Sequence, residues 1–453
     1  MTQEVKNPDV KLRQLEEKWA PVLDYNKRGF TPIQDMTKRK VTAQLLENMA
    51  GQTSPRTFLS EAGQIPSPNT QGGGFPAGTN MKGPIPMLMS IARRAIPNIV
   101  GFDVCGVQPM TAPTQLVIAL QARYTNPAGS EALFNEADTD FSGTGTHAGT
   151  ELPISVDGGS TPAPTFTYGT GLATTDAEKL GASDGADWAQ MSMSLKGFNV
   201  EAKSRALKTR WTHELAEDLM KTCNLDARSE LINIATTELV QAINREIVRT
   251  VYVTAQIGAQ DCDVAGVYNI NADIDGVTFG DKVKGLIYQI QKESTLIGYN
   301  TRRGHGNIAI VAPRVYDALA LSGMLDQTGI ARGTGTLLDV DISQNIFAGT
   351  LFNGRIKIFV DPFVPYGHDY VVVGYKGPSV FDAGVFYCPY SPLQMFEVLD
   401  SEQLQPTIGF KTRYGLSASP FALSSGAITG ALTADLNVYY RKFLVSGLDT
   451  AAN

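Results

Sequence analysis

The sequence predicts an α+β fold, and three observations lead to that class. Residues 226–251 carry apolar side chains at helical spacing with no glycine or proline among them, which predicts one long helix. From residue 281 onward, short apolar runs alternate with helical patterns, which predicts strands and helices in one region. Residues 141–190 hold 22 glycine, serine or threonine residues among 50, which is typical of an elaborated loop or a small β-rich insertion.

The composition indicates a protein with a large apolar core and argues against several classes. The chain has 453 residues, of which 43% are hydrophobic and 18% charged, so it is not a disordered protein. Lys and Arg number 38 against 45 Asp and Glu, and the formal net charge of −7 argues against a basic nucleic-acid-binding protein. No apolar run approaches the ~18 residues of a membrane span. The first residues also lack the pattern of a signal peptide.

Residue types that carry catalysis or bind metals are scattered along the sequence. The four histidines have no metal-binding spacing, and the glycine-rich runs 143–147 and 333–336 lack the lysine of a phosphate-binding loop. The cysteines form no CxxC pair, so we expect reduced, buried thiols instead of a zinc site or a disulfide framework. These cysteines are Cys105, Cys223, Cys262 and Cys388. The sequence therefore predicts no catalytic residue, no cofactor and no metal.

The first 61 residues, called the N-terminal segment below, differ in charge from the remaining 392 residues, called the body. The N-terminal segment carries 10 basic and 8 acidic residues, a net of +2, whereas the body carries 28 and 37, a net of −9. Residues 12–23 place apolar side chains at helical spacing, and Pro21 is expected to interrupt this helix. A second helix is predicted near 38–49. The apolar face of neither helix can form a core by itself, so one expectation is that these helices dock on the body of the same chain.

The remaining elements follow in chain order. Residues 64–86 are rich in Pro, Gly, Asn and Ser, which indicates an arm or linker, and a helix is predicted at about 86–96. Residues 201–221 are expected to be helical or extended. After the long helix at 226–251 we expect a helix near 281–297, a strand at 307–311, a helix at 313–321, and strands at 355–360, 370–374, 383–387 and 437–445.

Several strings in this sequence resemble the major capsid protein of T-even-type tailed phages. The N-terminal pair is IARRAIPN at 91–98 and FDVCGVQPM at 102–110. Five further strings match in the same order, namely EAKSR at 201–205, INRE at 243–246, VGYKGP at 373–378, DAGVFY at 382–387 and GFKTRYG at 409–415. The strings cover most of the chain, and the resemblance is weakest in residues 132–196.

The resemblance implies the Hong Kong 97-type capsid fold, which has an N-terminal arm, an extended E-loop, a peripheral (P) domain with a long spine helix, and an axial (A) domain. On that basis we expect seven segments. These are a propeptide at 1–61 that is removed on maturation, an N-terminal arm at 62–85, the first part of the P domain at 86–120, the E-loop at 121–210 with a β-rich insertion at about 132–196, the P-domain spine helix at 211–264, the A domain at 265–375, and the P-domain return strands with the C-terminus at 376–453.

The function that the resemblance implies is self-assembly into hexameric capsomers of an icosahedral shell, the head of a tailed double-stranded DNA phage assembled in the host cytoplasm. The implied partners are a vertex protein, a scaffold core, a prohead protease, a portal and decoration proteins, with the DNA enclosed without sequence-specific binding and no membrane involved. The pentameric vertex paralogue of the same fold is the alternative, and a nanocompartment shell is a weaker one. An added ligand-binding role of the insertion at 132–196 also stays open, although Trp188 is its only tryptophan.

Members of the family lose their propeptide to a protease that cuts after a motif of Leu or Ile, any residue, then Glu. Residues Leu59 to Glu61, followed by Ala62, match this motif and predict cleavage between Glu61 and Ala62. The motif also occurs at 15–17, 45–47 and 215–217, but those matches lie in predicted helices. Because a protease needs an extended substrate, the match beside the Pro- and Gly-rich arm is favoured.

Overall fold

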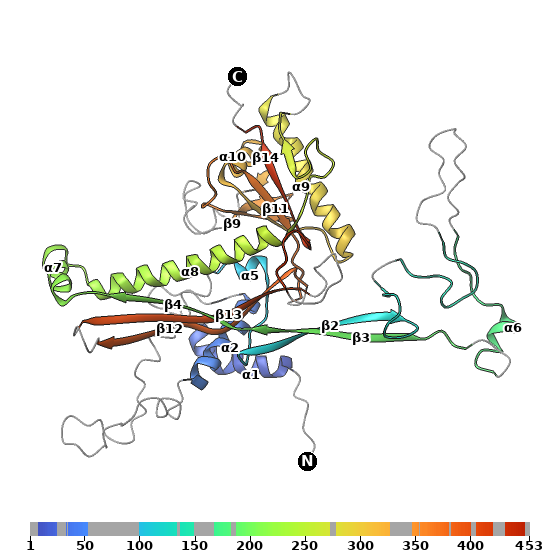
Figure 1. Cartoon of the computed structure of the whole chain (residues 1–453), viewed down its shortest axis with the longest axis horizontal. Coiled ribbons are helices and arrows are strands. Elements are labelled where there is room, and N and C mark those ends of the chain that lie inside the picture. Colours follow the sequence, from blue (N-terminus) through green and yellow to red (C-terminus); the bar gives the residue numbers. More distant parts are fainter. Residues whose placement is uncertain are drawn as a thin grey trace, which may run out of the picture. The chain divides into compact units, whose positions relative to one another are not determined.

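The computed structural model divides the chain into two compact units (Figure 1). One unit is formed by Met1–Leu116 together with Asn199–Asn453, and the other is Val117–Phe198. The structure describes residues 8–24, 33, 35–52, 99–133, 136–148, 167–182, 187–271, 278–326, 347–352, 354–379, 382–399, 405–419 and 431–448. Helices and strands are both abundant in these residues, which confirms the α+β class.

The described part of the N-terminal segment contains two helices, α1 (Pro8–Leu23) and α2 (Met36–Gln52). Both predicted helices are confirmed, but the expected interruption of the first at Pro21 is wrong. A proline removes one backbone donor and crowds the preceding turn, and at Pro21 this falls in the last turn of α1, where the helix is about to end. The helix predicted at about 86–96 lies outside the described residues.

The longest helix is α8 (Ala227–Thr254), which confirms the prediction from the apolar spacing of 226–251. Its 28 residues span ~42 Å at 1.5 Å per residue. Asp226 caps its N-terminus by accepting a hydrogen bond from the backbone N–H of Arg228 at 3.2 Å. The helix packs on a four-stranded sheet ordered β1 (Gly106–Val107), β12 (Val385–Leu399), β13 (Pro406–Ala418) and β4 (Lys203–Arg210).

Residues 201–221, which were expected to be helical or extended, contain both kinds of structure. They are extended in β4 and then helical in α7 (His213–Cys223), which Thr212 caps. No residue of α7 is buried, so Cys223 is exposed. The expectation that all four cysteines are buried is therefore wrong for Cys223, and Cys262 is only half-buried, whereas Cys105 and Cys388 are buried.

A second, eight-stranded sheet holds most of the apolar core. Its central strands are β7 (Ile308–Val311), β10 (Ile356–Val360) and β11 (Tyr370–Gly374), with β7 parallel to β10 and antiparallel to β11. The helices α9 (Phe279–Thr301) and α10 (Pro313–Leu321) belong to the same region. The other strands of this sheet are β5 (Ala255–Ile257), β6 (Val267–Asn269), β8 (Leu325–Asp326), β9 (Phe347–Leu351) and β14 (Asn437–Ser446). The helices and strands predicted within 281–374 are confirmed.

The C-terminal block 376–453, expected as one set of return strands, contributes to both sheets. β12 and β13 pair with each other, whereas β14 pairs antiparallel with β11 in the eight-stranded sheet. The strand predicted at 383–387 continues to Leu399 because Pro389 and Pro392 fall where the pairing register shifts, so neither proline breaks the ladder. The division into named capsid domains stays a prediction.

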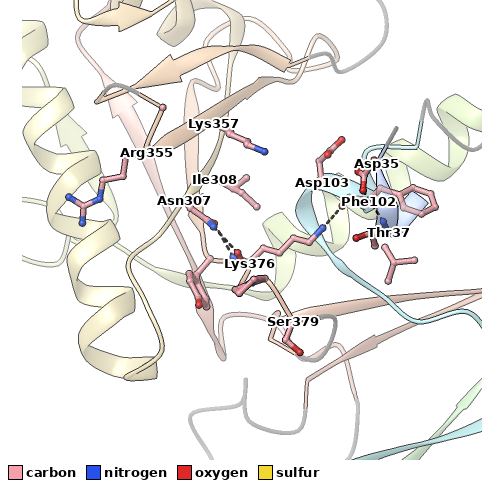
Figure 2. Close-up of a pocket in the computed structure, with 15 residues that line it drawn as sticks. Asp35, Thr37, Phe102, Asp103, Asn307, Ile308, Arg355, Lys357, Lys376 and Ser379 are labelled. Atoms are coloured by element: carbon pink, nitrogen blue, oxygen red, sulfur yellow. Dashed lines mark hydrogen bonds between the residues drawn. The ribbon is translucent and has the colours of Figure 1, made fainter. Parts of the chain in front are cut away.

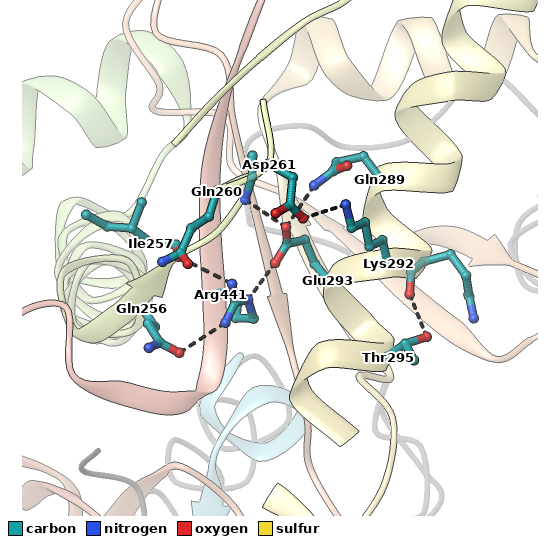
Figure 3. A network of polar contacts seen from close by, with 11 residues as sticks. Gln256, Ile257, Gln260, Asp261, Gln289, Lys292, Glu293, Thr295 and Arg441 are labelled. Atoms are coloured by element: carbon teal, nitrogen blue, oxygen red, sulfur yellow. Dashed lines mark hydrogen bonds and ion pairs between the residues drawn. The ribbon is translucent and has the colours of Figure 1, made fainter. Parts of the chain in front are cut away.

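The eight-stranded sheet and α9 share a buried polar network (Figure 3). Glu293 on α9 accepts a hydrogen bond from Arg441 Nε of β14 at 2.5 Å, and it also accepts from the Ala259 backbone N–H at 2.7 Å and from Gln289 Nε2 at 2.8 Å. Arg441 Nη1 donates in turn to Gln256 Oε1 at 3.1 Å. The Glu293 side chain is 1% exposed and that of Arg441 6%, so the pair is fully desolvated.

Most of a two-stranded ribbon lies in the second unit, formed by β2 (Thr114–Tyr124) and β3 (Met191–Glu201). Its other described elements are the short helix α6 (Thr174–Ala177) and two isolated bridges, Thr144 with Thr170 and Ala148 with Thr167. These bridges fall in the Gly-, Ser- and Thr-rich stretch.

Candidate assembly and processing surfaces

The predicted cleavage residues Leu59, Glu61 and Ala62 lie outside the described residues. The structure does describe the three competing motif matches. Residues 15–17 lie in α1, 45–47 in α2 and 215–217 in α7, so each is helical as expected. A helical backbone must unwind before a protease can bind it in extended form. This leaves 59–61 as the favoured processing motif, as a prediction.

The helices α1 and α2 are joined by ion pairs along their shared face. Arg39 of α2 pairs with Glu16 at 2.8 Å and with Asp24 at 2.5 Å, and hydrogen bonds to Asp24 and Glu16 raise the pKa of Arg39. Lys18 of α1 pairs with Glu47 of α2 at 2.6 Å and holds the pKa of that carboxyl below its usual value. Beside these pairs is a small apolar cluster made of Leu15, Trp19, Leu23, Ile33 and Ala43. The two helices therefore form one folded hairpin.

This hairpin docks on the body through α2. Val41 and Leu45, which are 2% and 3% exposed, join the main core cluster that includes Phe102 of α5 (Gly101–Val104). Lys38 pairs with Asp103 at 3.6 Å, and its ammonium lies 5.9 Å from the centre of the Phe102 ring. The expectation that the N-terminal segment docks on the same chain is confirmed for α2.

A single asparagine of α2 ties two distant parts of the body together. Asn48 Nδ2 donates to the backbone carbonyls of Met110 at 2.7 Å and of Tyr390 at 2.9 Å. Gln44 Nε2 donates to Asn48 Oδ1 at 3.0 Å and so orients the amide. Met110 is buried and Tyr390 is half-buried, so α2 supplies hydrogen bonds to two carbonyls that are partly shielded from water. We name this contact region of α2, α5 and β12 the docking surface.

A cavity of about 490 Å³ adjoins the docking surface (Figure 2). Asp35 and Thr37 of the N-terminal segment and Asp103 line it together with Lys357 and Lys376 of the body. Lys376 Nζ donates to the carbonyl of Phe102, and burial lowers the pKa of this lysine. Burial also raises the pKa of the nearby Cys105 thiol to about 12, so that thiol is protonated and unreactive at neutral pH. The opposite charges across the cavity support docking of the N-terminal segment.

The ribbon of the second unit carries an unpartnered apolar face. Met191, Met193 and Leu195 alternate along β3 and are 58%, 66% and 64% exposed. The opposite face is polar, where Arg123 Nε donates to Ser194 Oγ at 3.1 Å. We name the three apolar residues the apolar ribbon face. A contiguous exposed apolar surface of this kind is typical of a region that another molecule covers.

The basic turn at 302–305 and the histidine of the first glycine-rich run make contacts within the chain. Arg302, which follows α9, has φ +54 and stacks on the Tyr299 ring at 4.5 Å. Arg303 pairs with Asp382 at 3.6 Å within the chain. His147 contacts Thr139 Oγ1 through Nδ1 at 3.0 Å, and residues 333–336 lie outside the described residues.

The part of the chain that the structure describes contains no group of three or more His, Cys, Asp or Glu side chains that could hold a metal ion. None of the helices in this part of the chain is long and apolar enough to cross a membrane.

Comparisons with known proteins give the class of the chain. It is 33% identical to the major capsid protein of Vibrio phage KVP40, with 96% of this chain and 100% of that protein covered. It is 32% identical to the major capsid protein of Enterobacteria phage T4, over 96% and 99% of the two chains. The capsid vertex protein of phage T4 is 29% identical over only 54% of this chain and 57% of that protein, so the vertex alternative is the weaker one.

The chain is therefore a structural protein of the phage capsid. The family model of the Gp23 major capsid protein matches residues 83–445, and the chain belongs to this family. Among solved structures, a chain of Microbacterium phage Oxtober96 matches 77% of this chain and 91% of its own length, with a TM-score of 0.39 and 11% identity. A chain from the capsid of Myoviridae phage XM1 covers 77% and 92%, with a TM-score of 0.39 and 9% identity.

Proposed function

We propose that copies of this chain assemble into hexameric capsomers, and that the capsomers tile the icosahedral head shell of a tailed double-stranded DNA phage. The observation that carries the proposal is membership of the major capsid protein family over 83–445. The apolar ribbon face supports it, because a surface of this kind stays in contact with water unless another subunit covers it. A shell subunit contacts several neighbours, on the scale of obligate interfaces of roughly 2,000 Å² or more.

In this proposal, the described helices and sheets form the P domain, the A domain and the E-loop of the Hong Kong 97-type fold. The long helix α8 and the four-stranded sheet serve as the spine helix and body of the P domain. The eight-stranded sheet with α9 and α10 serves as the A domain, and it includes β14 from the C-terminal block. The ribbon of β2 and β3 serves as the E-loop, which covers a neighbouring subunit. A vertex protein, a scaffold core, a prohead protease, a portal and decoration proteins are the partners in this proposal.

The N-terminal segment serves as the propeptide. Cleavage between Glu61 and Ala62 would cut its covalent link to the body, but the hydrogen bonds of Asn48 and the apolar contacts of Leu45 do not depend on that peptide bond. Release therefore needs a further opening of the docking surface after cleavage. Release removes a net charge of +2 and leaves a body of −9, which repels packaged DNA and lets it slide.

The processing proposal predicts that Glu61→Gln blocks removal of the N-terminal segment. The amide removes the negative charge that the protease motif supplies, so we expect the full-length mass to persist in assembled particles. Intact mass spectrometry and N-terminal sequencing of purified particles provide the measurement. Glu217→Gln is the matched control, since it alters the same motif within the helix α7, and it should leave processing unchanged. Cleavage of Glu61→Gln particles at the Glu61–Ala62 bond at the normal rate would contradict the assignment.

The assembly proposal predicts that Met193→Ser combined with Leu195→Ser reduces shell formation at least tenfold. Both side chains are already exposed in the single chain, so the subunit should keep its fold and its thermal unfolding midpoint. Negative-stain electron microscopy and sedimentation count the shells. Ser192→Ala, on the polar face of the same strand, should assemble normally. A wild-type protein that stays monomeric under all assembly conditions would refute the proposed function itself.

A further inference from the structure

The loop between β10 and β11, residues 361–369, presents two aromatic side chains to solvent. Phe363 is 50% exposed and Tyr366 is 83% exposed. We name this segment the aromatic loop. In the single chain, the apolar surfaces of these two rings stay in contact with water, although a partner could bury them. The contacts around each ring show whether the ring is held in a fixed position.

Each of the two aromatics is backed by an arginine that pairs with a buried carboxylate of the same loop. Arg245 of α8 binds Asp361 with distances of 2.6 and 2.5 Å from Nη1 to Oδ1 and Oδ2, and its guanidinium lies 5.5 Å from the centre of the Phe363 ring. Arg314 of α10 pairs with Asp369 at 3.0 Å and lies 4.6 Å from the Tyr366 ring. The arrangement of aspartate, arginine and aromatic ring thus occurs at both ends of the loop.

The buried carboxylates fix the backbone of the loop. The Asp361 and Asp369 side chains are only 1% and 6% exposed. Asp361 also accepts from the Phe363 backbone N–H at 3.1 Å and from the Tyr370 hydroxyl at 2.5 Å. The two aromatic rings are therefore held in position before any partner arrives, which lowers the entropy cost of binding.

A cavity of about 290 Å³ opens beside the aromatic loop, and we name it the socket. Arg249 and Tyr252 of α8 line it from one side, and Val364 and His368 line it from the loop. Arg249 is exposed, and among the described residues no carboxylate pairs with it. The surface thus combines two exposed aromatic rings with an arginine that pairs with no described carboxylate, and tyrosine and arginine are enriched among the residues that dominate binding energy at protein interfaces.

We propose that the aromatic loop and the socket bind an acidic, apolar-edged surface of a second copy of this chain. Charge complementarity supports this occupant, because the body carries a net charge of −9 and every copy offers carboxylates to Arg249. The partner's apolar surface packs on Phe363 and Tyr366, and a carboxylate enters the socket. This inference rests on the proposed self-assembly and names one of its contact surfaces.

The test compares Tyr366→Ala and Arg249→Glu with wild type in the full-length chain. Each should raise the protein concentration needed for half-maximal shell formation at least tenfold, measured by sedimentation and electron microscopy. Arg249→Lys keeps the charge and should change that concentration by less than threefold. Tyr288→Ala removes a tyrosine of similar exposure, 70%, on α9, where no buried carboxylate among the described residues supports the ring, and it should stay within threefold of wild type. Thermal unfolding midpoints of the variants should match wild type.

Two outcomes separate this inference from the proposed function. If wild type forms shells and both Tyr366→Ala and Arg249→Glu form them at the wild-type concentration, the aromatic loop is not an interface and this inference is overturned alone. If wild type forms no shells at all, the proposed function fails with it. A loss in Arg249→Glu that Arg249→Lys does not share supports the charge-pairing part of the inference.

Discussion

Glu293→Ala should lower the free energy of unfolding by about 3–5 kcal/mol, the cost of removing one partner of a buried ion pair. The substitution leaves Arg441 charged and buried without its carboxylate, and it also leaves the Ala259 backbone N–H without its acceptor. Burial makes the effect large, since solvent reaches neither side chain to replace the lost interaction. Denaturant unfolding of the isolated subunit, followed by tryptophan fluorescence, measures the change.

A neighbouring pair on the same helix provides the control. Lys292 pairs with Asp261 at 2.6 Å, but the two side chains are 34% and 71% exposed. Lys292→Ala should therefore cost less than about 1 kcal/mol, because water and salt screen an exposed pair. If Glu293→Ala proved no more destabilising than Lys292→Ala, the buried network would not contribute to the stability of the eight-stranded sheet.

Leu45→Ala should loosen the docking of the N-terminal segment by about 2–5 kcal/mol, through lost burial and the cavity left behind. Leu45 is 3% exposed and contacts the core of the body, so the cost falls on the docking surface. A change of about 2 kcal/mol corresponds to roughly a 30-fold larger population of the undocked state. Hydrogen exchange of the α2 backbone amides should accelerate by at least that factor.

Asn48→Ala should act in the same direction by about 1–3 kcal/mol, since the partly buried carbonyls of Met110 and Tyr390 each lose a hydrogen bond of about 0.5–1.5 kcal/mol. Lys18→Ala is the control, because its exposed pair with Glu47 joins α1 to α2 without touching the body. It should leave the exchange of α2 within a few-fold of wild type. Unchanged exchange in both Leu45→Ala and Asn48→Ala would mean that the segment is not held at the docking surface.

The sequence predicted the elements whose pattern is local. The α8 helix was predictable because its apolar residues repeat at 3–4 spacing over many turns without a helix breaker. The strands β7, β10 and β11 were predictable because they are short, buried and almost entirely apolar. The long hairpin of β12 and β13 was underestimated, because the predicted strand ended at 387 and none was predicted over β13. Register shifts opposite β13 accommodate Pro389 and Pro392 within the longer strand.

The candidate surfaces were predictable only in part. The N-terminal segment was recognisable from its charge and from the apolar residues at helical spacing in its two helices. The Leu59-to-Glu61 motif was recognisable from its residue types. No local sequence pattern predicts the hydrogen bonds of Asn48, because its partners Met110 and Tyr390 lie 62 and 342 residues away in the chain. The aromatic loop could have been noticed as two aspartates flanking two aromatics, but its supporting arginines come from two separate helices.

Composition and local pattern were enough to establish the α+β class, the position of the long helix, the charge difference between the N-terminal segment and the body, and the resemblance to phage capsid proteins. The folded chain was needed to show that β14 joins the eight-stranded sheet, that α2 docks on the body, and that Glu293 pairs with Arg441. The difference arises because periodicity, charge and turn chemistry act between near neighbours in the chain. A buried contact such as Glu293 with Arg441, 148 residues apart, exists only after folding excludes water from both side chains.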